Sequence, residues 1–196
     1  YLPISPYGAA KVAAERYVAM FDRAATLEAL GADDPARAIP ASFAATTVIL
    51  SNVYGPRQRA GYGAVNIFAR ALLAAEPVTL YGDGRNVRDF VYVADAVRAL
   101  MWAGDCLTTD GRPDLQRPKR VLVGTGVATT DEALLSLVAH EVHAQTDVAT
   151  LDRAVRAPAR PCDIRRMVFP ATGMATTTLA DGVRATVEAI RTEIGL

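Results

Sequence analysis

The segment from Thr46 to Val53, with the sequence TTVILSNV, constrains the fold of this chain more than any other feature. Most of its side chains are β-branched or apolar, and they occupy successive positions instead of alternating with polar ones. A strand with this pattern is apolar on both faces, which is typical of a central strand in a sheet covered on both sides. The segment therefore predicts an α/β architecture.

Helical and strand patterns alternate along the rest of the chain. Helices are predicted at Tyr7 to about Leu30, Ala64 to Ala75, Asp95 to about Gly104, about Thr130 to His143 and roughly Leu179 to Ile194. Further strands are predicted at Val78 to Tyr81, Asp89 to Val93 and Arg120 to Val123. A turn-rich loop is predicted from Gly82 to Arg88, and Asp95 is expected to cap its helix. This alternation favours a mostly parallel sheet.

Charge and composition exclude several classes of function. Twenty-one basic residues balance 21 acidic residues, without a run of like charge, so we expect neither a nucleic-acid nor a membrane partner. With 51% apolar residues among 196, the chain is long enough to bury a core. The two cysteines, Cys106 and Cys162, are too few for a disulfide framework. Without a signal peptide or long apolar run, we expect a cytoplasmic location.

The chemistry of the chain is suggested first by Tyr7 and Lys11 in the segment SPYGAAK. Residues four apart on a helix leave the same face about one turn apart, so these two side chains can act together. An ammonium near a phenol favours the phenolate, which can accept a proton from a sugar hydroxyl. Loss of hydride from the same carbon requires a nicotinamide cofactor. The spacing alone is also compatible with a solvated pair on a helix surface.

Four further motifs accompany this pair. They are SNVYGPRQ, YGDGRNVRDFVYVADAVRAL, VGTG and ARPCD. In order and spacing the five motifs resemble the extended short-chain dehydrogenases/reductases, specifically the NAD-dependent nucleotide-sugar epimerases and dehydratases. The resemblance spans nearly the whole chain. It implies the C-terminal portion of a Rossmann-type doubly wound parallel sheet plus a small α/β substrate-binding lobe. Residues 1–62 would be the second half of the NAD(P)-binding domain and 63–196 mainly the substrate lobe, with 82–104 returning to the Rossmann part.

The resemblance also implies roles for individual residues. Tyr7 is the expected catalytic acid/base, and Lys11 is expected to assist it and to hold the nicotinamide ribose. Ser51 is expected near the nicotinamide. The implied cofactor is NAD rather than NADP. The residues expected to contact a nucleotide-sugar substrate are Asn52, Leu80, Tyr81, Arg88 and Arg160. For the two arginines the chemistry agrees, because planar guanidinium groups suit phosphate oxygens.

The implied activity is that of an epimerase or 4,6-dehydratase, an isomerase or a lyase. In that family a strand and a Gly-rich turn that precede the tyrosine hold most of the NAD. We expect that segment to lie outside this chain, so the chain by itself is expected to be inactive. The full-length protein is expected to be a homodimer. Two alternatives stay open: a non-catalytic fragment or degenerate relative that binds nucleotide sugars, and a structural or regulatory Rossmann-like protein.

Two weaker patterns have simpler interpretations. The segment GTGVAT, from Gly124 to Thr129, resembles a dinucleotide-binding fingerprint without its third glycine, and we interpret it as a tight turn between a strand and a helix. His140 and His143 lie three apart on a predicted helix and could share a metal. No third ligand accompanies them in the sequence, so we predict no metal site.

Overall fold

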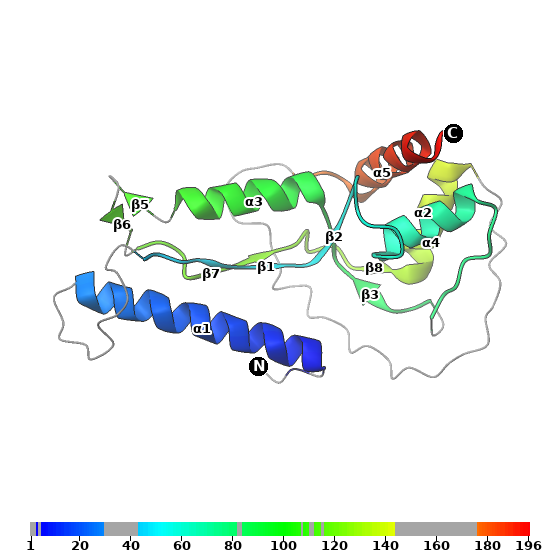
Figure 1. Cartoon of the computed structure of the whole chain (residues 1–196). Helices are drawn as coiled ribbons and strands as arrows, with labels where there is room; N and C mark the ends of the chain where they lie inside the picture. The colour runs from blue at the N-terminus through cyan, green and yellow to red at the C-terminus, as the bar shows by residue number, and fades with distance from the viewer. Residues whose placement is uncertain are drawn as a thin grey trace. The chain divides into compact units, whose positions relative to one another are not determined.

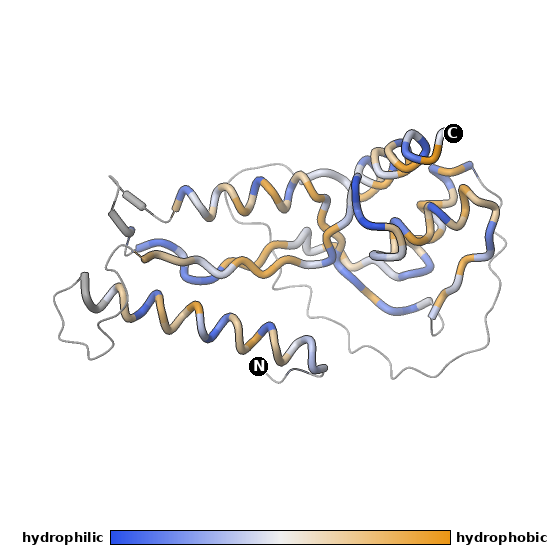
Figure 2. Tube along the Cα trace, viewed as in Figure 1, coloured by the Kyte–Doolittle hydropathy of each residue, from blue (hydrophilic) through white to orange (hydrophobic). Residues whose placement is uncertain are grey.

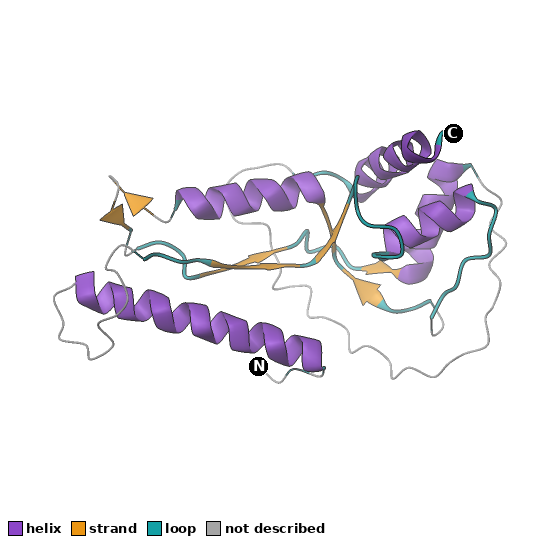
Figure 3. Cartoon of the chain, viewed as in Figure 1, coloured by secondary structure: helices purple, strands orange, loops and turns teal. Residues whose placement is uncertain are grey.

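The computed structural model describes residues 3, 5–29, 43–81, 84–106, 108–109, 112–114, 116–143 and 176–196 (Figure 1). The chain divides into two compact units. The first unit comprises Tyr1–Ile49 and Leu100–Val121, and the second comprises Leu50–Ala99 and Leu122–Leu196. Helices and strands alternate in sequence (Figure 3), which confirms the predicted α/β class.

Helix α1 (Pro6–Ala29) dominates the first unit. Its run of alanines and unbranched side chains has high helix propensity, and a proline is well tolerated in the first turn. The Ser5 hydroxyl accepts a hydrogen bond of 3.1 Å from the Gly8 N–H, which caps the start of the helix. The predicted helix from Tyr7 to about Leu30 is therefore confirmed, and Tyr7 lies in its first turn.

The predicted central strand is divided at Ser51. Strand β1 (Thr47–Leu50) pairs with β7 (Arg120–Val123), whereas β2 (Asn52–Tyr54) pairs in parallel with β4 (Phe90–Tyr92). The Ser51 N–H donates to the Val123 carbonyl, and the next N–H, that of Asn52, donates to the Asp89 carbonyl. The backbone thus changes its pairing partner between two consecutive residues. The parallel register of β2 and β4 agrees with the predicted parallel sheet.

Three helices enclose the core of the second unit. They are α2 (Ala64–Leu73), α4 (Asp131–Val142) and α5 (Leu179–Ile194). Their buried residues form one cluster with Tyr54, Val78 and Phe90; the helical members include Val65, Phe68, Leu134, Val138, Val183 and Val187. Figure 2 shows apolar and polar residues alternating along these helices, as expected for helices with one buried face.

The ends of α4 and α5 follow standard capping chemistry. The Thr130 hydroxyl accepts from the Ala133 N–H, and the Thr178 hydroxyl accepts from the Asp181 N–H, each at 3.1 Å. Gly195, with φ of 77°, ends α5 in the left-handed conformation that glycine adopts readily. The predicted helices at about Thr130 to His143 and at Leu179 to Ile194 are confirmed.

Gly182 in α5 allows a close approach between that helix and the β2–β4 pair. A Cβ atom at this position would lie 2.8 Å from Tyr54 Cζ, closer than real Cβ atoms come, and 3.0 Å from Tyr92 Cδ2, which is an unusually tight contact. Tyr54 is buried, and its hydroxyl donates to the Leu179 carbonyl at 3.4 Å. Burial, aided by the negative charges of nearby acids, raises the pKa of Tyr54 above its ordinary value, so it stays neutral.

Three predictions about local structure are wrong. Val78 to Tyr81 forms no strand; Val78 instead packs into the core as part of a loop. Asp95 is not a cap, because it lies inside α3 (Val93–Asp105), where its buried carboxylate accepts from the Thr177 N–H at 2.8 Å. The predicted loop from Gly82 to Arg88 ends in a short strand, β3 (Val87–Arg88), which pairs antiparallel with β8 (Thr129–Thr130).

The segment between α3 and β7 contains a small hairpin, β5 (Thr108–Thr109) with β6 (Arg112–Pro113), which the sequence did not predict. The strand at Arg120–Val123 is confirmed. Within the described residues, none of the helices is both long and apolar enough to cross a membrane.

Candidate functional site

Tyr7 and Lys11 share one face of α1. The Lys11 Nζ atom lies over the Tyr7 ring, 5.4 Å from the ring centroid, which confirms the predicted geometry of the pair. Both side chains are exposed, Tyr7 at 74% of its surface. An ammonium over an exposed aromatic ring gives a weak attraction of about 0.5–1 kcal/mol. The pair is therefore aligned and also open to a ligand.

Ser51 and Asn52 lie where the backbone changes its pairing partner. The Asn52 side-chain amide donates to the Asp89 carbonyl at 3.2 Å, parallel to the backbone bond of 3.0 Å from its own N–H. These two bonds fix the orientation of the Asn52 side chain. The Ser51 hydroxyl is buried and has no hydrogen-bond partner among the described residues. A buried hydroxyl without a partner is uncommon and leaves a polar group that a ligand can satisfy.

Arg88 lies on β3, and its side chain is 40% exposed. Its Nε atom lies 3.6 Å from Oδ1 of Asp131, the first residue of α4. Leu80 packs against the core of the second unit, whereas Tyr81 is 56% exposed. Arg160 lies outside the described residues.

The turn that resembles a dinucleotide fingerprint already binds a carboxylate of the same chain. Asp89, which is buried, accepts hydrogen bonds from the Thr125 N–H, the Thr125 hydroxyl and the Gly126 N–H, at 2.6 to 3.0 Å. Because these donors are occupied, the turn does not present them to a pyrophosphate. This arrangement supports the interpretation of the segment as a tight turn. His140 and His143 lie on α4 and at its end, with ring centroids 6.5 Å apart.

The described candidates fall into two groups. Tyr7 and Lys11 belong to the first unit, and Ser51, Asn52, Leu80, Tyr81 and Arg88 belong to the second. Each group is ordered by its own contacts, and the convergence of the two groups stays a prediction. The sequence did not indicate Asp89 and Asp131. A buried acid after Arg88 and an acid in the first turn of a helix are both ordinary features, so neither carries a signal of its own.

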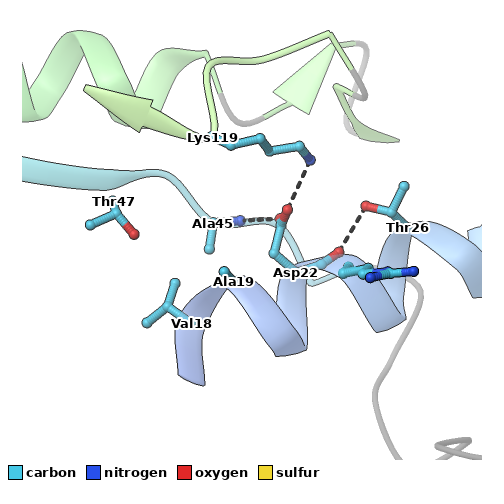
Figure 4. A pocket seen from close by; sticks show the side chains of 8 residues that line it. Val18, Ala19, Asp22, Thr26, Ala45, Thr47 and Lys119 are labelled. Carbon is cyan, nitrogen blue, oxygen red and sulfur yellow. Dashed lines mark hydrogen bonds and ion pairs between the residues drawn. The ribbon is translucent and has the colours of Figure 1, made fainter. Parts of the chain in front are cut away.

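A cavity of about 260 Å³ lies elsewhere in the first unit (Figure 4), lined by Val18, Ala19, Asp22, Arg23, Thr26, Ala45, Thr47 and Lys119. None of the predicted site residues lines it. Its one buried acid is Asp22, which accepts from the Ala45 N–H at 2.9 Å and pairs with Lys119 Nζ at 2.8 Å and with buried Arg117. Burial alone would raise the pKa of Asp22, but these hydrogen bonds and the charge of Arg117 outweigh it and hold the pKa below its ordinary value.

This carboxylate predicts acid sensitivity of the first unit. A group whose pKa is lower in the folded than in the unfolded state stabilises the fold above its unfolded pKa, and that contribution is lost as the pH falls through the folded pKa. We expect the Asp22 contribution to be complete above about pH 5, to decline as the pH falls past the unfolded pKa near 4, and to be lost only below the folded pKa, which lies lower. Urea unfolding at pH 3, 4, 5 and 7 measures it.

The variant Asp22→Asn provides the control. It is expected to be less stable by about 3 kcal/mol at pH 7, because Arg117 loses its buried partner, and to show a weaker dependence on pH below 5. Equal pH dependence of the free energy of unfolding in the variant and the wild type would contradict this account.

Comparison with known proteins extends over almost the entire chain. Residues 1–114 match the NAD dependent epimerase/dehydratase family. A UDP-glucose 4-epimerase from Mycolicibacterium smegmatis is 34% identical over 198 residues, an alignment that covers 96% of this chain and 54% of that protein. The chain spans about half the length of the curated relatives it matches.

Solved structures give the same result for the fold. The UDP-glucose 4-epimerase of Thermotoga maritima with UDP-glucose is 30% identical, with a TM-score of 0.70 over 98% of this chain and 55% of that one. The Thermus thermophilus UDP-glucose 4-epimerase complex with NAD is 28% identical, with a TM-score of 0.63 over 97% and 55% of the two chains. The predicted Rossmann-type α/β fold is confirmed.

Proposed function

Because this chain belongs to the NAD dependent epimerase/dehydratase family, we propose that the protein carrying it is a nucleotide-sugar epimerase or 4,6-dehydratase in which Tyr7 is the acid/base. The observation that carries this proposal is the Tyr7–Lys11 pair, in which the ammonium lies 5.4 Å from the centre of the phenol ring on an exposed face of α1. The similarity of the chain to UDP-glucose 4-epimerases supports a uridine diphosphate sugar as the substrate.

The residues of this chain fit the nicotinamide end of NAD, the cofactor of the family. Lys11 offers an exposed ammonium that can donate to ribose hydroxyls, and Ser51 offers a buried hydroxyl without a partner in the described part of the chain. NAD, when bound, accepts a hydride from a sugar carbon. We propose that Lys11, Tyr7 and Ser51 are the contacts that this chain supplies to it.

Tyr7 would transfer the proton of the substrate hydroxyl. Its oxygen takes the proton of the hydroxyl group on the carbon that loses hydride; in the epimerase reaction it returns that proton when the same carbon is reduced again, whereas in the dehydratase reaction that carbon stays oxidised. Lys11 places a positive charge 5.4 Å from the centre of the Tyr7 ring, and we propose that this charge assists the proton transfer. As an epimerase, the protein would therefore store and return one proton within a single catalytic cycle.

The second unit would hold the nucleotide diphosphate. Arg88 is half exposed and carries a planar fork of donors suited to phosphate oxygens. Asn52, whose side chain donates to the Asp89 carbonyl, is proposed to contact the nucleotide sugar. Leu80 and exposed Tyr81 would lie beside the base. Arg160 is proposed as a second diphosphate contact.

Binding of UDP-glucose tests the substrate assignment. Isothermal titration of the chain with UDP-glucose is expected to show binding, and Arg88→Ala is expected to weaken it by about 10- to 100-fold, the usual effect of removing a charged hydrogen-bond donor to phosphate. Arg184→Gln is the matched control, because Arg184 is an exposed arginine of the same unit that pairs with Glu141 and Asp181 on the surface. Equal losses in the two variants would rule out a specific phosphate contact at Arg88.

We also propose that the whole protein is a cytoplasmic homodimer. Helix α1 supports the dimer, since it exposes Tyr17, Met20 and Phe21, large apolar side chains that a second copy would cover. The assignment of residues 1–62 to a cofactor-binding domain and of 63–196 mainly to a substrate lobe is part of the same proposal.

A further inference from the structure

Asp131 is buried beside Arg88 for a structural reason that the sequence does not show. β3 and β8 pair with Val87 opposite Thr130 and Arg88 opposite Thr129. The Asp131 N–H continues this ladder by donating to the Asn86 carbonyl at 3.0 Å. Asn86 immediately precedes β3, so this bond extends the register by one pair and places Asp131 opposite Asn86, two positions along from Thr129, the residue opposite Arg88.

One oxygen of the Asp131 carboxylate has no hydrogen-bond donor in the described part of the chain. Its side chain is only 11% exposed, and its Oδ1 atom has no hydrogen-bond partner among the described residues. A buried carboxylate oxygen without a donor is costly, and a specific one calls for an explanation. Arg88 forms an ion pair with it, with the Nε atom 3.6 Å from Oδ1, slightly too far for a hydrogen bond.

The contact with Asp131 involves the Nε side of the Arg88 guanidinium. Asp131 faces the Nε atom, which leaves the terminal amino groups for a second anion. A guanidinium carries five donors in a rigid plane, so two anions can bind its different edges at once. A shift of about 0.6 Å would bring Nε and Oδ1 to an ordinary hydrogen-bond distance near 3.0 Å.

We propose that Asp131 is a positioning residue for Arg88. It holds the guanidinium by its Nε–H, so that the terminal amino groups are directed at the diphosphate of the substrate, and the Nε–Oδ1 hydrogen bond closes when the diphosphate binds. This inference rests on the proposed function, because it requires Arg88 to bind phosphate. It adds a residue that does not itself contact the substrate.

The substitution Asp131→Glu separates position from charge. It keeps the negative charge near the diphosphate but moves the carboxylate by one methylene group. We expect it to weaken the binding of UDP by about 5-fold, since the ordered arginine is lost, and to leave the binding of uridine within about 2-fold. Glu132→Asp is the matched control: this exposed neighbour changes by one methylene in the opposite direction and should leave both affinities unchanged.

A double-mutant cycle identifies Arg88 as the residue through which Asp131 acts. In the Arg88→Ala background, Asp131→Glu is expected to cause no further loss of UDP affinity. The same 5-fold loss in that background, or an unchanged UDP affinity in Asp131→Glu alone, would overturn the inference while leaving the phosphate contact of Arg88 intact. If Arg88→Ala itself binds UDP as tightly as the wild type, the proposed role of Arg88 fails first and the inference fails with it.

A second measurement tests the Nε–Oδ1 hydrogen bond with Asp131 left unchanged. The Nε–Hε resonance of Arg88, assigned by its disappearance in Arg88→Lys, is expected to exchange more slowly with water in the wild-type protein when UDP is added. Addition of uridine should leave its exchange rate unchanged. An exchange rate that is the same with and without UDP would overturn the proposed closure of the hydrogen bond.

Discussion

Turnover of UDP-glucose by the whole protein is expected to fall by about 10²- to 10⁴-fold when Tyr7 is replaced by phenylalanine. General acid/base catalysis by a positioned side chain contributes a factor of this size, and the substitution removes only the hydroxyl group that would carry the proton. The ring, and with it the contact to Lys11 at 5.4 Å, is retained. Conversion of UDP-glucose in the presence of NAD measures the rate, and titration measures the binding of substrate, which should change by less than about 2-fold.

Tyr17→Phe is the control for this experiment. Tyr17 is also an exposed tyrosine of α1, 66% accessible, and lies nearly three turns from Tyr7. Its hydroxyl has no proposed catalytic part, so this variant should keep the wild-type rate. Comparable rates for the wild type and Tyr7→Phe would rule out Tyr7 as the acid/base.

The substitution Gly182→Ala is expected to reduce the free energy of unfolding by about 2–3 kcal/mol, at the upper end of the usual cost of overpacking a core. The new methyl group would meet Tyr54 and Tyr92, both held by the β2–β4 pair, so neither α5 nor the rings can move without disturbing the core. For a chain of this size the melting temperature should fall by roughly 4–12 °C. Thermal unfolding followed by circular dichroism measures the shift.

Two further variants test whether overpacking causes the loss of stability in Gly182→Ala. Gly104→Ala places the same methyl group in α3, where no atom lies within 4 Å, and should be neutral or slightly stabilising because alanine favours a helix. Tyr54→Phe removes the hydroxyl that lies nearest to the added methyl group, so the double variant Gly182→Ala with Tyr54→Phe should recover part of the loss. A Gly182→Ala protein as stable as Gly104→Ala would contradict the packing described for α5.

The sequence predicted most of the elements because their signals are local. Three predicted helices agree with the structure to within about one residue: the alanine-rich α1 and the capped helices α4 and α5. The exceptions depend on tertiary contacts. Val78 belongs to an apolar run that resembles a strand, yet it fills a position in the core cluster. Asp95 resembles a cap, but its carboxylate binds the Thr177 N–H, 82 residues further along the chain.

Within the candidate site, the sequence predicted the geometry of the Tyr7–Lys11 pair, and the roles of the site residues stay predictions. The spacing of Tyr7 and Lys11 determines their common face, because helix geometry alone sets it. The split of the central strand at Ser51 could not be predicted, since it depends on tertiary contacts: the Ser51 N–H donates to the Val123 carbonyl and the Asn52 N–H donates to the Asp89 carbonyl. Asp131 was overlooked for the same reason: the antiparallel pairing of β3 with β8, which brings it to Arg88, involves only two residues in each strand.

The route of the backbone between the two compact units limits how this protein can be recombined with its relatives. The chain passes from one unit to the other after Ile49, Ala99 and Val121, and each of these positions lies inside a regular element: β1, α3 and β7. A chimaera joined at the unit boundaries would therefore interrupt a strand or a helix at every junction. Joins within the loop between β2 and α2, residues 55–63, would leave these three elements whole.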